Sequence, residues 1–235
     1  KYIARINLPQ KQVHLLFGDA FHQAVEWLLS KEKHPEISKL GIAYKVFDKV
    51  FDITKLYPEE QSDFEKLKPL GPKMLYVFWK ELPRLKLELN IAEGQSEYWI
   101  EGKLKDPFGD EIFPLVTKGR IDRKTDDERI LELKTSAGKW NENDVKFKWQ
   151  TMFYGWLFYQ NNGRHPKSIN YIIVTKQKTP QIQVLEAKYT LDDYSKLFQE
   201  CKNIINKIEL GIFGRPEEFH PPFCDCFKYE EALST

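Results

Sequence analysis

Apolar residues recur every three or four positions in the N-terminal third of the chain, which is the spacing of one face of an α-helix. A second such run covers 39–53 after the break at Pro35, a third starts at Pro58, and a fourth follows the break at 69–72. We therefore expect residues 18–88 to be mostly helical. The first helix is indicated by Phe17, Phe21, Ala24, Val25 and Leu28.

Further along, apolar and polar residues alternate, as they do in strands whose two faces differ. The runs 97–104 and 112–123 alternate in this way, and a polar turn at 124–128 joins the second run to a third at 129–135. Residues 89–135 therefore predict a meander of three strands, in which the last two form an antiparallel hairpin.

In the C-terminal half, apolar residues first recur at helical spacing, and apolar and polar residues then alternate as in strands. We expect a long helix at 141–161 and a strand pair at 168–176 and 181–189. A last helix should begin at the capping box Thr190–Asp193 and end at Gly211. This order of elements predicts an α/β protein with a mixed central sheet flanked by helices.

Length and composition fit a single domain over residues 1–235. We expect a helical region at 18–88, an α/β core at 89–211 and a tail at 212–235. Apolar residues make up 41% of the chain, enough to fill such a core. No apolar run approaches the roughly eighteen residues that cross a bilayer, and no secretory signal is visible. Three cysteines favour a reducing compartment, so we expect a cytoplasmic protein.

Basic and acidic residues are nearly balanced over the whole chain, at 36 and 35, but not along its middle. Between Lys118 and Lys178 there are 13 Lys and Arg against 7 Asp and Glu, a net charge of +6. A basic surface around an acidic pocket suits an enzyme that binds a phosphate backbone. For each single lysine, a solvated surface position is the competing interpretation.

Two carboxylates and an amine are placed to converge at the predicted hairpin. Glu132 and Lys134 lie two apart on one strand and therefore share a face, and Asp122 on the preceding strand needs only to point the same way. Such a set can hold a divalent metal against a phosphodiester and help to activate water. The competing interpretation is an exposed salt-bridge face.

Other candidates lie on the predicted helices. Gln150 and Tyr154 are four residues apart and therefore share a helical face, where they either bind DNA, brace the ligands or form the polar edge of a core stripe. His22 lies on the rim of the apolar stripe of the first helix, where a packed or surface histidine is the commoner case.

The chain carries four short motifs in order, namely Gly18–His22 at a helix entry, Gly119–Asp122 (GRID), Glu132–Lys134 (ELK) and Gln150–Tyr154 (QxxxY). In this order they resemble the RecB-like exonuclease branch of the PD-(D/E)XK nuclease superfamily. This branch includes nuclease domains of bacterial recombination helicases, CRISPR-adaptation nucleases and phage exonucleases. The Pro-Asp pair that names the superfamily is Ile-Asp here, a replacement that is ordinary in this branch.

The resemblance implies a restriction-endonuclease-like core and a deoxyribonuclease that uses Mg²⁺ or Mn²⁺. It assigns catalysis to Asp122, Glu132 and Lys134, and metal binding to the two carboxylates with His22. The QxxxY pair is expected to bind DNA or to brace these ligands.

Some members of this branch hold an iron–sulfur cluster on four cysteines. Here Cys224 and Cys226 lie in the tail, and Cys201 lies in an apolar helix stripe typical of core. Three thiols cannot supply four ligands, so we expect no iron–sulfur cluster.

The leading interpretation is a metal-dependent DNA exonuclease of recombination, repair or phage DNA processing. A helicase, an annealing protein or another recombination factor is a candidate partner. No sequence-reading motif is visible, and Trp140, Trp149 and Tyr154 are candidates to stack on a frayed terminal base. The alternatives are a restriction- or defence-type endonuclease, a nucleic-acid-binding subunit without activity, and a carboxylate-pair glycosidase.

Overall fold

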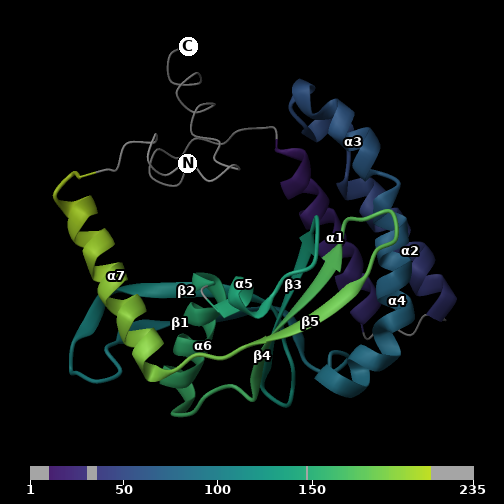
Figure 1. Cartoon of the computed structure of the whole chain (residues 1–235). Coiled ribbons are helices and arrows are strands. Elements are labelled where there is room, and N and C mark those ends of the chain that lie inside the picture. Colours follow the sequence, from purple (N-terminus) through teal and green to yellow (C-terminus); the bar gives the residue numbers. More distant parts are fainter. Residues whose placement is uncertain (1–10, 31–35, 147, 213–235) are drawn as a thin grey trace.

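The computed structural model describes residues 11–30, 36–146 and 148–212, in which a group of N-terminal helices lies beside a mixed sheet (Figure 1). The N-terminal group comprises α1 (Val13–Leu29), α2 (Glu36–Val50), the 3-10 turns η1 (Ile53–Lys55) and η2 (Pro58–Glu60), α3 (Gln61–Leu67) and α4 (Leu70–Leu89). The sheet region comprises β1 (Gln95–Lys105), β2 (Ile112–Lys124), β3 (Arg129–Ser136), α5 (Glu142–Lys146), α6 (Trp149–Asn162), β4 (Ser168–Thr175), β5 (Ile182–Ala187) and α7 (Leu191–Glu209).

In the described part of the chain, five strands form one sheet in the order β1-β2-β3-β4-β5. Neighbouring strands are antiparallel except β3 and β4, which are parallel. Parallel neighbours need a crossover connection, and α5 and α6 supply it between β3 and β4. The mixed sheet flanked by helices, with a helical region before it, is confirmed.

The sheet opens between β2 and β3. Along their described length, the β2–β3 ladder is limited to residues 123–124 and 130–131, whereas β1 and β2 pair over most of their length. In Figure 1, β1 and β2 accordingly extend away from β3, β4 and β5. The residues that come directly after the ladder on the two strands are Asp122 and Glu132.

Both faces of the sheet are covered. The helices α1, α2 and α4 pack on one face, where Leu131 and Leu133 of β3 belong to their core. The helices α6 and α7 pack on the other face, with Ile130 of β3 and Ile173 of β4. Because β4 is buried on both sides, it is almost continuously apolar in sequence.

One predicted helix, 141–161, is wrong as a single element, because α5 ends at Lys146 and α6 begins at Trp149. Lys148 is extended at this junction, with φ −80° and ψ 106°. The hydroxyl of Tyr189 donates to the backbone oxygens of Val145 and Lys148 at 3.1 and 3.4 Å, which helps to satisfy carbonyls near the break. Helical periodicity cannot reveal a partner that is 41 to 44 residues away in sequence.

Other boundaries differ by a few residues. The first helix begins at Val13, five positions before the predicted start of the helical region, and α4 begins at Leu70. Pro72 therefore lies in the first turn of α4, where a missing N–H removes no helical hydrogen bond. The break between α3 and α4 therefore falls at Lys68 and Pro69, at the start of the predicted break at 69–72.

The last helix is as predicted. Thr190 and Asp193 form the capping box at the start of α7, and Cys201 lies on the buried face of this helix, in the core. Cys224 and Cys226 lie outside the described residues. None of the described helices is long and apolar enough to cross a membrane.

Candidate active site

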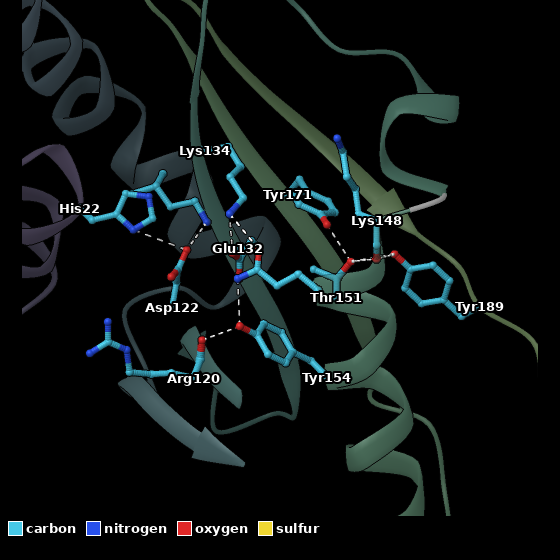
Figure 2. Close-up of polar contacts among 12 residues, drawn as sticks. His22, Arg120, Asp122, Glu132, Lys134, Lys148, Thr151, Tyr154, Tyr171 and Tyr189 are labelled. Carbon is cyan, nitrogen blue, oxygen red and sulfur yellow. Dashed lines mark hydrogen bonds and ion pairs between the residues drawn. The ribbon is translucent and has the colours of Figure 1, made fainter. Parts of the chain in front are cut away.

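Asp122 links the two strands at the point where they separate. Its Oδ2 atom accepts a hydrogen bond from the backbone N–H of Leu133 at 2.8 Å. A carboxylate of β2 thus takes the place of the next ladder contact to β3, which fixes it beside Glu132 (Figure 2). The predicted convergence of these two carboxylates is present in the structure.

Glu132 is completely buried, and its two carboxylate oxygens differ in their hydrogen bonding. Oε1 accepts a hydrogen bond from Nζ of Lys134 at 2.7 Å. Oε2 is buried, and among the described residues no donor reaches it. Burial, followed by the negative charge of Asp122, raises the pKa of Glu132 well above its usual value. A buried carboxylate oxygen without a partner is costly, so this position favours a cation.

Lys134 lies between β3 and α6. Its Nζ donates to Oε1 of Glu132 at 2.7 Å and to Oε1 of Gln150 at 3.1 Å. The side chain remains 30% exposed, so the amine is held in place yet open on one side. This arrangement can present a positive charge to a bound anion.

The QxxxY pair braces this amine. Nε2 of Gln150 donates to the hydroxyl of Tyr154 at 2.9 Å, and that hydroxyl donates to the backbone oxygen of Arg120 at 2.7 Å. Burial raises the pKa of Tyr154 to about 12, so the hydroxyl stays protonated. Tyr154 is buried in the core and its ring is not available to stack on a base.

Gly119 has a role that motif reading did not identify. A Cβ atom at this position would lie 2.5 Å from Cε1 of Tyr154, closer than packed carbon atoms approach. The glycine of GRID therefore makes room for the tyrosine of QxxxY. Each of the two motifs is visible in the sequence, but the contact between Gly119 and Tyr154 is not.

His22 approaches the site from α1. Its Nδ1 atom lies 3.6 Å from Oδ2 of Asp122 (Figure 2). Burial disfavours the charged form of His22, but the nearby Asp122 carboxylate outweighs it and raises the pKa of the histidine. His22 and Asp122 line a cavity of about 40 Å³ together with Glu26 and Glu97. Within the described ranges, no three His, Cys, Asp or Glu side chains form a ready-made metal cluster.

Glu97 enters this cavity from β1. It has a φ of 51°, in the left-handed region that a side chain rarely adopts, and its Oε2 lies 2.6 Å from Nε of Arg120. Burial raises its pKa although Arg120 opposes the shift. The sequence assigns no role to Glu97, since a positive φ at a glutamate has no signature in the sequence.

The turn that precedes β3 is tied down by charge-assisted hydrogen bonds. Asp127 accepts from the hydroxyl of Thr125 at 2.6 Å, from Arg129 at 3.1 Å and from Lys167 at 2.6 Å. Although burial opposes the shift, these donors hold the pKa of Asp127 well below its usual range. The predicted turn at 124–128 thereby sets the register of the two carboxylate-bearing strands.

The family model of the PD-(D/E)XK nuclease superfamily matches this chain over residues 1–227. With the sheet and the motif residues in place, the match defines a nuclease. The chain belongs to the PD-(D/E)XK nuclease superfamily.

The solved structures that are similar to this chain include two that align with most of its length. One is a candidate exonuclease from Eubacterium rectale, with 16% identity, a TM-score of 0.47, and coverage of 97% of this chain and 77% of the other. The second is SSO0001, with 14% identity, a TM-score of 0.35, and coverage of 86% and 80%. No curated protein matches the chain at a significant level.

Proposed function

We propose that this nuclease is a divalent-metal-dependent deoxyribonuclease that acts from DNA ends, in recombination, repair or phage DNA processing. The observation that carries the proposal is the buried Oε2 of Glu132, which has no hydrogen-bond partner in the part of the chain that the structure describes. It lies beside a second carboxylate, Asp122, and a hydrogen-bonded amine, Lys134.

The residues present suit a hard divalent cation. Carboxylate oxygens select Mg²⁺ or Mn²⁺ over softer metals. Asp122 and Glu132 would hold such an ion, with His22 near enough to Asp122 to add a nitrogen. When bound, the ion would polarise the scissile phosphate and lower the pKa of an attacking water.

Lys134 would stabilise the negative charge that develops on the phosphate during attack. Glu132 and Gln150 fix its amine from two sides, so little reorganisation is needed when substrate binds. Tyr154 holds Gln150 in turn and anchors the set to the backbone of β2.

The alternatives fit less well. A binding subunit without activity would not need the amine, the two carboxylates and their braces all intact. A glycosidase uses a carboxylate pair, but here one carboxylate is ion-paired with Lys134, which suits a phosphate better. An endonuclease shares the same chemistry and differs in how DNA reaches the site.

The function is tested by incubating end-labelled linear DNA with chelator-treated protein before and after the addition of Mg²⁺ or Mn²⁺. We expect short labelled products only when metal is added. Cleavage that persists in excess chelator, or none with either metal, would reject the proposed function.

We expect His22→Ala to slow cleavage and to raise the metal concentration that gives the half-maximal rate, because a ligand to the ion is lost. The shift should be about tenfold or more. Metal titrations of cleavage rate provide the measurement. His14→Ala is the matched control on the same helix, because His14 contacts Lys176 rather than the carboxylates. An unchanged metal dependence would return His22 to a packing role.

We expect Gly119→Ala to slow the cleavage of bound DNA by roughly 10- to 100-fold, because the new methyl group displaces Tyr154 and, through Gln150, the amine of Lys134. Single-turnover cleavage rates and circular dichroism provide the measurement. Gly138→Ala is the control, since a Cβ there meets no atom of the described residues within 4 Å. Equal rates for the two variants would show that the glycine does not position the site.

A further inference from the structure

An exposed tryptophan lies on the β1–β2 hairpin close to the proposed active site. Trp99 is 64% exposed, and Cζ of the cross-strand Arg120 lies 6.0 Å from its ring centroid. Nε of Arg120 is also held by Oε2 of Glu97 at 2.6 Å. The ring is therefore steadied by a cation–π contact while most of its surface faces solvent.

The Trp99–Arg120 pair is continuous with the site. Asp122 and Arg120 are two apart on β2 and therefore share a face of the strand. Trp99, Arg120 and Gln150 line one surface depression of about 690 Å³, within the roughly 300–1,000 Å³ typical of ligand sites. Gln150 is the residue that accepts a hydrogen bond from Lys134. The depression thus leads from the amine to the indole ring.

Charge alone does not account for this surface. Arg120 is ion-paired with Glu97 at 2.6 Å, and its neighbour Lys118 with Glu101 at 2.8 Å. The paired acids neutralise much of the positive charge that phosphates would need. What remains accessible is the aromatic ring, and a ring of this kind binds unpaired bases by stacking.

We infer that Trp99, held by Arg120, is a nucleotide subsite that stacks an unpaired base of a single-stranded DNA end next to the scissile phosphate. The inference rests on the proposed nuclease site and adds the form of its substrate. Bases inside a duplex are already stacked on their neighbours, so the ring gains little from them. Trp149 is exposed on the neighbouring helix but does not line the depression. Of the three aromatic residues that line it, Trp99 is exposed, Phe153 is half-buried and Tyr154 is buried, so Trp99 is the one that offers its ring to a ligand.

The test measures binding in chelator, where cleavage does not interfere. Fluorescence anisotropy is recorded for a labelled oligothymidylate and for an abasic strand of the same length. Trp99→Ala should weaken the binding of oligothymidylate by about tenfold and leave the abasic strand unchanged. Trp99→Phe should restore most of the loss, because a phenyl ring also stacks. Phe108→Ala is the matched control, since Phe108 is likewise 64% exposed and lies in the turn at the other end of the hairpin.

The outcomes separate this inference from the proposed function. Equal oligothymidylate binding by wild-type protein and Trp99→Ala would overturn the subsite, even when metal-dependent cleavage is normal. An equal loss for both strands would also overturn it, because the contact would then not involve bases. Selective loss of oligothymidylate binding in a protein that cleaves nothing would support the subsite and reject the nuclease.

Discussion

Glu132→Gln, Asp122→Asn and Lys134→Ala are each expected to reduce DNA cleavage by at least about 10²- to 10³-fold while leaving the fold intact. The carboxamides keep the shape of the carboxylates but lose the charge that would hold a metal ion. Lys134→Ala removes the amine that would face the phosphate. Rates are compared on linear DNA at saturating Mn²⁺, with circular dichroism as the check of folding.

At Glu132, the substitution that removes activity should not lower the stability of the fold. Burial raises the pKa of this carboxyl, which means that keeping it charged opposes folding at neutral pH. Glu132→Gln should therefore unfold no more easily than the metal-free wild type. Glu101→Gln is the control and should keep full activity, because Glu101 is also ion-paired with a lysine but is 62% exposed and lies outside the catalytic set. Full activity in any of the three site variants would remove that residue from the catalytic set.

The second large effect concerns DNA topology. A covalently closed circle should survive, while the linear form of the same DNA is degraded to short products of many lengths. The surface leading to the amine offers an aromatic ring for an unpaired base, and such a base is present at a frayed end. Phosphate contacts position DNA without reading its sequence, so degradation should not depend on sequence.

Gel electrophoresis of matched circular, nicked and linearised plasmid gives the measurement. Raising the salt concentration should slow degradation of the linear form, as expected where phosphate contacts contribute to binding. Discrete fragments from the closed circle would favour the endonuclease alternative.

Much of the fold follows from short-range patterns. The alternation in 97–104 and 112–123 gave strands close to their observed bounds, and the Thr190–Asp193 capping box marked the start of α7. These elements depend on neighbours within a few residues, which sequence patterns record. The single helix at 141–161 was wrong, and the carbonyls near its break accept hydrogen bonds from Tyr189, which comes from another part of the chain.

The proposed site likewise has features that sequence patterns predict and one that they do not. Strand periodicity was enough to place Glu132 and Lys134 on one face, and helical spacing to place Gln150 beside Tyr154. The opening of the sheet at Asp122 was not predictable, because it depends on a side chain replacing a ladder contact.

Gly119 and Glu97 show the same limit. The close approach of the Tyr154 ring and the left-handed backbone of the glutamate are properties of the packed molecule. Neither leaves a periodic signal in the chain, so motif spacing alone assigns no role to these positions.

The central claim is that Asp122 and Glu132 form a divalent-metal site, and calorimetric titration of Mn²⁺ into chelator-treated protein tests it most directly. Wild-type protein and Lys134→Ala should show saturable binding, since the lysine contacts the carboxylate but is not a ligand. Asp122→Asn and Glu132→Gln should bind at least about tenfold more weakly. Equal Mn²⁺ binding by wild-type protein and Glu132→Gln would contradict the claim.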